Sequence, residues 1–409
     1  MKSIPLFTTK KEIFTTLVVI VVLLAISLSY EFYKYKQITT YSLHVTTAKV
    51  LSDYQKEGKN YRILKLRSRD FTFYTTYKEA LHVKRNDELK VIFYTKGIDF
   101  YGYLKGFYAS SKSLHVKSRS VKNCLVSFVK NQHKDSVSRE LYNALFFAIP
   151  LSKDLREDIT KWGIAHLVAI SGFHLGILSA ILFFLLKPIY AFFQDRYFPY
   201  RNRTADLALL VFLVLGSYTY FIDMTPSVLR AYAMSMIGFF LFSRNIKIIS
   251  FGTLFFTICI ILILFPHLLF SIAFWFSISG VFYIFLFLYH FSTLSKISIF
   301  ILLHFWVYIL MLPVVHFVFD VFSLYQLFSP FISMVFILFY PLSLLLHVVG
   351  LGGVMDSFLV WFFSLHVEID LVITPMWFFV CYLCLSLLAI RFRLVAFFLP
   401  LFALGLFFV

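Results

Sequence analysis

Polar side chains capable of chemistry gather at residues 166–176, where a long apolar run begins. The stretch contains two imidazoles, from His166 and His174, and the hydroxyl of Ser171. A serine and a histidine can act as nucleophile and general base, and imidazoles can border a water-filled path or, when protonated, contact phosphates. Lipid supplies no water to an unpaired polar group, whose burial costs about 1–3 kcal/mol. These side chains are therefore expected to pack against other helices or to line a pathway.

The spacing of these residues favours a pathway lining over an active site. On one continuous helix with about 3.6 residues per turn, His166 and His174 project from roughly the same face. Small residues recur there at intervals of three and four, which lets helices pack closely: Ser171, Gly172, Gly176, Ser179 and Ala180. A hydrolytic triad also needs a third group and a strand-to-helix turn, and the neighbouring sequence offers neither. We expect no catalytic residue, and a membrane-embedded hydrolase that uses Ser171 and His174 remains the alternative.

A second polar site precedes another apolar run. Thr225 followed by Pro226 is a typical helix start, which places Arg230 one turn inside the run. A charged residue within a span usually faces a cavity or a partner, and a guanidinium suits a phosphate. Arg230 is therefore a candidate contact for a phosphate backbone, unless it reaches the interface or pairs with Asp223. Asp356, an acid inside the apolar run 354–366, is a further candidate, either as a partner of Arg230 or in a loop.

Most of the positive charge lies in residues 31–135. This quarter of the chain has 21 basic and 9 acidic side chains, which is +12 of the net +17. Short β-branched or aromatic runs separated by turn residues predict about five strands there: Val45–Leu51, Tyr61–Leu66, Phe71–Tyr77, Leu89–Tyr94 and Leu114–Lys117. A small OB-type barrel fits this count and is one known way to hold a single strand of nucleic acid, although other small barrels or sandwiches fit equally.

Basic and aromatic side chains alternate along these strands. Basic groups follow phosphates and aromatic rings stack on bases, so the pattern suits a groove for single-stranded nucleic acid. The candidate contacts are Arg62, Lys65, Arg67, Arg69, Tyr74 and Lys105. The alternative is a small β domain whose aromatic residues fill its core and whose lysines are solvated.

The composition excludes a soluble globular protein, because 60% of the 409 residues are hydrophobic and 53 are phenylalanine. An apolar run at residues 13–30 follows three lysines and predicts an anchor with a cytoplasmic N-terminus. Ten further apolar runs follow residue 166: 167–190, 205–222, 226–243, 248–265, 268–290, 297–319, 325–348, 354–366, 371–390 and 394–409. We expect a polytopic α-helical membrane protein with 10–11 transmembrane helices, of which 354–366 is short enough to be re-entrant, and an inserted OB-like domain.

Loop charges orient these crossings in the cytoplasmic membrane. If the chain starts inside, the basic residues of the short loops fall on the cytoplasmic side, as the positive-inside bias requires. Residues 31–165 are then extracytoplasmic. The expected parts are a tip and anchor (1–30), an OB-like domain (31–134), amphipathic interfacial helices (135–165) and a helical channel domain (166–409).

No metal or cofactor is expected. Three of the four cysteines lie in apolar runs, where cysteine usually behaves as a small hydrophobic residue, and Cys124 has no evident disulfide partner. The two-residue gap between Cys381 and Cys384 lacks the oriented polar neighbours of a metal or redox site. No phosphate-binding loop occurs either, so the sequence shows no nucleotide-driven motor.

The run His-Leu-Val-Ala-Ile-Ser-Gly-Phe-His-Leu-Gly at 166–176 resembles the signature of the ComEC family of competence proteins. Pro226-Ser-Val-Leu-Arg230-Ala is similar to a second block of that family, and similarity extends through residues 100–117, 143–176, 269–280 and 312–330. The resemblance implies a channel that imports single-stranded DNA across the cytoplasmic membrane during natural transformation. A transporter of small anions is a further alternative.

One feature of many family members is missing from the sequence. It contains no His-x-His-x-Asp-His run, so it resembles a short form without the metallo-β-lactamase-like domain, and we expect no nuclease activity. The resemblance implies single-stranded DNA and the bilayer as partners. It also implies a periplasmic DNA-binding protein outside and a cytoplasmic motor or single-strand-binding protein inside, and it leaves the oligomeric state open.

Overall fold

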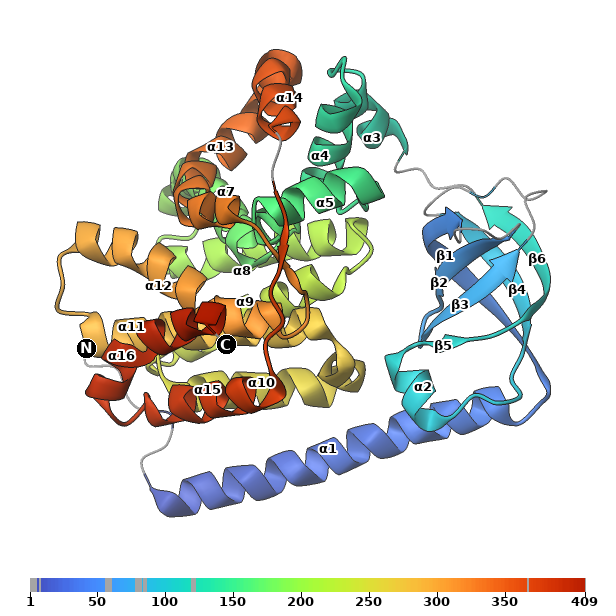
Figure 1. Cartoon of the computed structure of the whole chain (residues 1–409), viewed down its shortest axis with the longest axis horizontal. Coiled ribbons are helices and arrows are strands. Elements are labelled where there is room, and N and C mark those ends of the chain that lie inside the picture. Colours follow the sequence, from blue (N-terminus) through green and yellow to red (C-terminus); the bar gives the residue numbers. More distant parts are fainter. Residues whose placement is uncertain are drawn as a thin grey trace. The chain divides into compact units, whose positions relative to one another are not determined.

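The computed structural model describes residues 6, 9–55, 61–77, 83, 87–118, 123–365 and 368–408. The chain forms two compact units (Figure 1). The β unit comprises residues 9–127 and 259–271, and the helical unit comprises 128–258 and 272–409. This division differs from the expected parts at three places. The N-terminal helix and residues 259–271 belong to the β unit, whereas residues 128–134 belong to the helical unit.

A six-stranded mixed sheet forms the centre of the β unit. Its strands are β1 (Leu43–Gln55), β2 (Arg62–Arg67), β3 (Thr72–Tyr77), β4 (Glu88–Tyr94), β5 (Phe107–Tyr108) and β6 (Ser111–Ser118). The strand order is β5-β3-β2-β1-β4-β6, and every pair is antiparallel except β3 with β5. The five strands expected from the sequence are confirmed, and the short β5 is an addition.

Alternation along the strands gives this sheet an aromatic core. Leu64, Leu66, Phe73 and Phe93 are fully buried, while their sequence neighbours are more exposed. Helix α2 (Phe100–Lys105) adds Tyr103 to the same core.

Two tyrosine hydroxyls tie helix α1 (Lys10–Thr39) to the rest of the β unit. The hydroxyl of Tyr103 lies 3.1 Å from Glu31 Oε2, and that of Tyr35 donates to the carbonyl of Ile98 at 3.0 Å. Rings from α1 and α2 also meet, since Phe32 and Phe100 form an edge contact with centroids 5.3 Å apart. The last turns of α1 are therefore part of the folded β unit.

The remaining helices follow the apolar runs. Their bounds are α3 Asn123–Lys130, α4 Ser136–Phe147, α5 Lys153–Lys161, α6 Ala165–Val168, α7 Gly172–Tyr197, α8 Arg203–Phe221, α9 Pro226–Ser243, α10 Phe251–Leu264, α11 Ile272–Phe291, α12 Lys296–His316, α13 Ser329–Val349, α14 Asp356–Ser364, α15 Met376–Leu388 and α16 Arg393–Leu404. Short 3-10 turns and two two-residue strands, β7 (Val321–Phe322) and β8 (Asp370–Leu371), join some of them.

Six helices in the described part of the chain are long and apolar enough to cross a membrane. They are Lys10–Thr39, Gly172–Tyr197, Arg203–Phe221, Ile272–Phe291, Lys296–His316 and Leu324–Val349. Each of the other five apolar runs contains a shorter apolar helix of 10–17 residues. The protein is therefore a multi-pass membrane protein.

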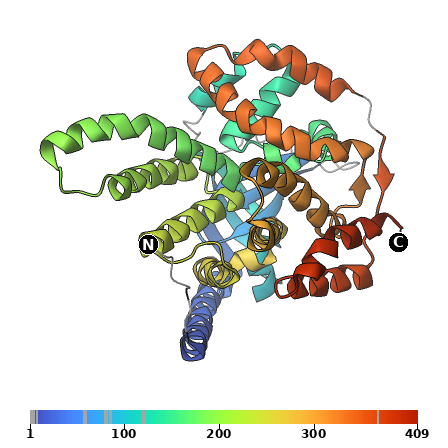
Figure 2. The same ribbon diagram turned by 90° about the vertical axis from the view of Figure 1, so that its left-hand side faces the viewer.

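Side chains at both ends of α13 contact the segment 142–166. Near its start, Ser329 Oγ donates to the carbonyl of Gly163 at 3.0 Å, and Ser333 Oγ lies 3.3 Å from His166 Nε2. Near its end, the ring of His347 lies 4.4 Å from that of Tyr142. The chain from 142 to 166 thus runs antiparallel to α13, and Figure 2 shows α13 and α14 in orange beside the teal and green ribbons of this segment.

Helix α4 buries one face against other helices of the helical unit. Its residues from Leu141 to Phe146 are all buried, and they share a core with Phe336 and Tyr340 of α13. The charged side chains at 139 and 140 stand in its first turns, and the interfacial position expected for residues 135–165 stays a prediction.

Gly163 is required where this segment meets α13. Its φ of +65° is unfavourable for other residues, and a Cβ there would lie 3.2 Å from the side chain of Gln326. We expect Gly163→Ala to lower the free energy of unfolding by about 1–2 kcal/mol, measured by thermal unfolding of the purified protein in detergent. Gly280→Ala is the control, because nothing lies within 4 Å of a Cβ at that position in α11. Equal unfolding midpoints for the two variants would contradict the packing described here.

Candidate functional site

The polar run at 166–176 is interrupted between two helices. Helix α6 ends at Val168 and α7 begins at Gly172, so His166 and His174 do not share a continuous helix. The expected common face is therefore wrong. Ser171 occupies the N-cap position of α7, where its N–H donates to Nδ1 of His174 at 3.2 Å and its Oγ lies 3.2 Å from the same atom.

The two histidines occupy different environments. His174 is fully buried and meets the ring of Tyr340 edge-on at 4.6 Å. His166 is exposed, with Nδ1 3.1 Å from the carbonyl of Gly163 and Nε2 3.3 Å from Ser333 Oγ. His166 thus connects α6 to α13.

Of the two glycines in the run, only Gly172 lies at a close contact with another helix. A Cβ on Gly172 would lie 3.5 Å from Cβ of Ala231, so α7 and α9 approach closely at this point. A Cβ on Gly176 would meet nothing within 4 Å. The structure does bring Ser171 and His174 together, but no carboxylate is among the hydrogen-bond partners that the described residues give His174. Their contact is accounted for by the helix cap.

Arg230 is a buried cation without a partner in the described chain. Helix α9 begins at Pro226 as expected, but Oγ1 of Thr225 does not cap it and makes no hydrogen bond. The Arg230 side chain is 5% exposed, and its Nε and Nη1 have no hydrogen-bond partner among the described residues. A buried guanidinium in this state is unstable unless an anion or water reaches it.

Asp356 does not pair with Arg230. Its Oδ1 lies 2.8 Å from Nδ1 of His133, which is 223 positions away in the sequence. The expected pairing is wrong because the turn just before α14, the helix that begins with Asp356, packs against the segment before α4, where Gly352 N donates to Gln132 Oε1 at 2.9 Å.

The β unit presents a row of basic and aromatic side chains on the outer surface of the sheet. Lys65 on β2 stands opposite Tyr74 on β3, and its Nζ lies 5.5 Å from the centre of that ring. Tyr74 in turn is paired with the exposed Tyr108 of β5, and Arg67 stands opposite Lys49 of β1. We call these five residues the basic-aromatic strip. Strand pairing brings them together from four strands.

Arg62 and Lys105, two other predicted contacts for nucleic acid, interact with neighbouring side chains of the β unit. Nη2 of Arg62 forms an ion pair with Oδ2 of Asp53 at 2.9 Å, so its charge is already balanced. Nζ of Lys105 lies 5.6 Å from the ring centre of Tyr101 on α2. The aromatic residues Phe71, Phe73 and Phe107 fill the core, as the alternative interpretation of the pattern required.

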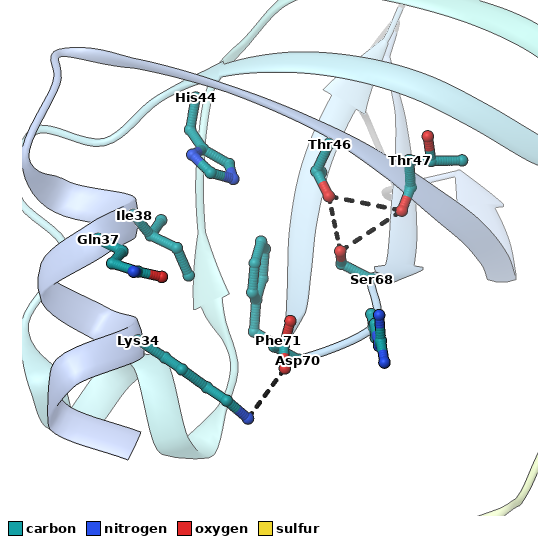
Figure 3. A pocket seen from close by; sticks show the side chains of 10 residues that line it. Lys34, Gln37, Ile38, His44, Thr46, Thr47, Ser68, Asp70 and Phe71 are labelled. Atoms are coloured by element: carbon teal, nitrogen blue, oxygen red, sulfur yellow. Dashed lines mark hydrogen bonds and ion pairs between the residues drawn. The ribbon is translucent and has the colours of Figure 1, made fainter. Parts of the chain in front are cut away.

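Arg69 borders a shallow pocket of about 340 Å³ between α1 and the sheet (Figure 3). Within it, Lys34 Nζ pairs with Asp70 Oδ1 at 2.9 Å, and the hydroxyls of Thr46 and Ser68 are 2.6 Å apart. Burial lowers the pKa of His44, which also lines the pocket and contacts the ring of Phe93. Most polar groups of this pocket therefore bond to one another.

Sequence reasoning missed two histidines of the helical unit. His133 is 2% exposed and His347 is 3% exposed, and their Nε2 atoms lie 2.9 Å apart. A signal was available, because His347 is an imidazole within the apolar run 325–348 and requires a partner there.

The fold and these sites define a multi-pass membrane protein with a buried cation in its helical unit and a basic sheet surface in its β unit. The family model described as Competence protein matches residues 150–408, which is more than half of the chain. The chain therefore belongs to the Competence protein family. It is also 26% identical over 173 residues to an uncharacterized protein of Aquifex aeolicus (strain VF5), over 42% of this chain and 38% of that protein. The match thus spans less than half the length of this relative.

Proposed function

We propose that the protein is a channel that imports single-stranded DNA across the cytoplasmic membrane during natural transformation. The observation that carries the proposal is the buried, unpaired guanidinium of Arg230. A phosphodiester supplies the missing acceptors and the opposite charge, and Arg matches phosphate oxygens with two parallel hydrogen bonds. Membership of the Competence protein family supports this choice of anion.

The β unit would capture the DNA strand before it enters the channel. The basic-aromatic strip offers cations for phosphates and ring faces for bases. We also infer that the sheet closes into an OB-like barrel. Strands β5 and β6 stand at opposite ends of the strand order but are separated only by Ala109 and Ser110. The Ala109 N–H donates to the carbonyl of Tyr74 at 2.9 Å, and the Tyr94 N–H donates to that of Ser110 at 3.1 Å, so one segment bonds to both edges.

The transport path would need partners on both sides of the membrane. The sequence has no phosphate-binding loop that would mark a motor within the chain. We propose a DNA-binding protein that delivers the strand outside and a motor or single-strand-binding protein that withdraws it inside. His166, Ser171 and His174 would border the entry, with Ser171 and His174 shaping the start of α7 and His166 tying α6 to α13.

Contacts of Gln132 bear on the membrane topology. Its Nε2 donates to the carbonyl of His347 at 3.1 Å and its Oε1 accepts from Gly352 N at 2.9 Å, so residues 132 and 347–352 lie on one side of the membrane. With residues 31–165 outside, the α13–α14 turn is outside too, whereas eleven successive crossings would put it inside. The turn contains no Lys or Arg, so the positive-inside bias does not place it. We infer that α13 and α14 form a hairpin that does not reach the cytoplasm, leaving about nine crossings.

Replacing Arg230 tests the channel. We expect Arg230→Ala to lower DNA entry into the cytoplasm at least about tenfold, because one lost guanidinium–phosphate contact is worth about 1.5–3 kcal/mol. Capture of DNA outside and the amount of protein in the membrane should stay unchanged. Cells lacking the gene are complemented with each variant, and bound and imported labelled DNA are measured separately. The matched control is Arg196→Ala, an exposed arginine at the end of α7. Wild-type entry with Arg230→Ala would remove Arg230 from the pathway.

Replacing residues of the strip tests capture. The purified full-length protein should bind a single-stranded oligonucleotide with an affinity that falls as salt rises. Tyr74→Ala should weaken binding by about 1–3 kcal/mol, and Lys65→Ala should reduce the salt dependence by about one phosphate contact. Lys90→Ala, an exposed lysine on β4, serves as the control and should bind like the wild type. Unchanged affinity in a Lys65→Ala/Tyr74→Ala double variant would show that the strip does not bind DNA.

Cysteine labelling tests the hairpin. In a variant without the four native cysteines, Leu351→Cys in the exposed α13–α14 turn should react with a membrane-impermeant maleimide on intact cells. Lys90→Cys in the β unit is the outside reference, and Lys247→Cys between α9 and α10 is the inside reference. Labelling of Leu351→Cys only after permeabilisation would mean that α13 crosses the membrane.

A further inference from the structure

A buried chain of hydrogen bonds in the helical unit has no part in the proposed transport. Asp356 Oδ1 lies 2.8 Å from His133 Nδ1, and His133 Nε2 lies 2.9 Å from His347 Nε2. Nδ1 of His347 lies 2.6 Å from the carbonyl of Ser343, one turn earlier on α13. The three contacts join the segment before α4 to both helices of the α13–α14 hairpin.

The hydrogen bonds fix the number of protons that His133, His347 and Asp356 hold together. A carbonyl only accepts, so Nδ1 of His347 carries a proton, and neutral His347 then offers Nε2 as an acceptor. His133 must donate from Nε2 to His347, and one further proton must lie between its Nδ1 and the carboxyl of Asp356. The three side chains therefore hold one proton more than two neutral histidines and a carboxylate would hold. Their combined net charge is zero.

We propose that His133, His347 and Asp356 form a proton-binding site that acts as a pH-dependent clasp between residues 132–133 and the α13–α14 turn. A second proton would put N–H groups on both facing Nε2 atoms and would leave two imidazolium rings in contact. Loss of the shared proton would leave two lone pairs facing each other and an uncompensated buried charge. The clasp is closed in one protonation state only, and acidification opens it.

Two ionisable side chains of α4, Arg139 and Tyr142, contact residue 133. Arg139 Nε donates to the carbonyl of His133 at 2.9 Å and its Nη2 donates to that of Lys134 at 3.1 Å, so this guanidinium holds the backbone of the loop. The ring of Tyr142 stacks on His133 at 4.7 Å, and burial, followed by the charge of Asp356, raises the pKa of its hydroxyl, which stays neutral.

Two other roles fit the geometry less well. A proton-conducting chain must continue, but His347 ends on a backbone carbonyl of its own helix. A tetrahedral zinc ion bound by both Nε2 atoms would hold them about 3.3 Å apart and would need further ligands. The described residues contain no cluster of three or more His, Cys, Asp or Glu side chains suited to a metal. The observed 2.9 Å is a hydrogen-bond distance.

Hydrogen exchange of the full-length protein in detergent tests the clasp. After correction for the intrinsic pH dependence, exchange of the amides at 131–135 and 349–355 should rise about tenfold or more between pH 7.5 and pH 5. Protection that is independent of pH in the wild-type protein would overturn the proposal. Protection that increases on adding Zn²⁺ and falls with a chelator would overturn it as well, in favour of a shared metal ion.

Matched variants identify the groups responsible. His347→Gln supplies a neutral acceptor to His133 and should keep these segments protected with little dependence on pH. Asp356→Ala removes the group that shares a proton with Nδ1 of His133 and should raise exchange at both pH values. His304→Gln on α12 is the control, because His304 makes the same bond to a carbonyl one turn earlier, at 2.7 Å from Phe300 O, and has no hydrogen bond to a histidine among the described residues. If His347→Gln retained the wild-type pH dependence, the titrating group would lie elsewhere and the proposal would fail.

Discussion

Pairing of polar groups along α13 is the constraint on which the helical unit depends. Apolar side chains gain little by leaving lipid for a neighbouring helix, so they do not select one packing arrangement over another. Contacts such as Ser329 with Gly163 and His347 with His133 do select one, because a missed partner leaves a buried polar group unsatisfied. These contacts set the register of α13 against the segment that leads into α7.

The need to pair buried polar groups also distinguishes side chains that have partners inside the protein from Arg230. Ser171 and His174 contact each other at the start of α7, although Nε2 of His174 is buried without a partner in the described residues, and Asp356 pairs with His133. Arg230 differs, because its buried nitrogens without an acceptor in the described residues belong to a charged group. In the function proposed above, an anion offsets the cost of burying this charge.

The sequence predicted well the features that depend on local periodicity. Alternation located all five expected strands, and composition located every apolar helix. Prediction from the sequence failed where a residue fits two local structures equally well, and where its partner is distant in the sequence. Ser171 and Gly172 fit a continuous small-residue stripe as well as a helix cap, and only the bond back from His174 decides for the cap. No local pattern relates Asp356 to His133.

Two features together favour a nucleic-acid strand over a small anion as the ligand. A small anion would accept hydrogen bonds from the buried nitrogens of Arg230. It would give no role to the rings of Tyr74 and Tyr108 on the strip that also holds Lys65. Ring faces contribute to binding when bases stack on them, and cations contribute through phosphates, so a single strand uses both kinds of group. Under the proposed function, each unit carries groups that match a part of the same polymer.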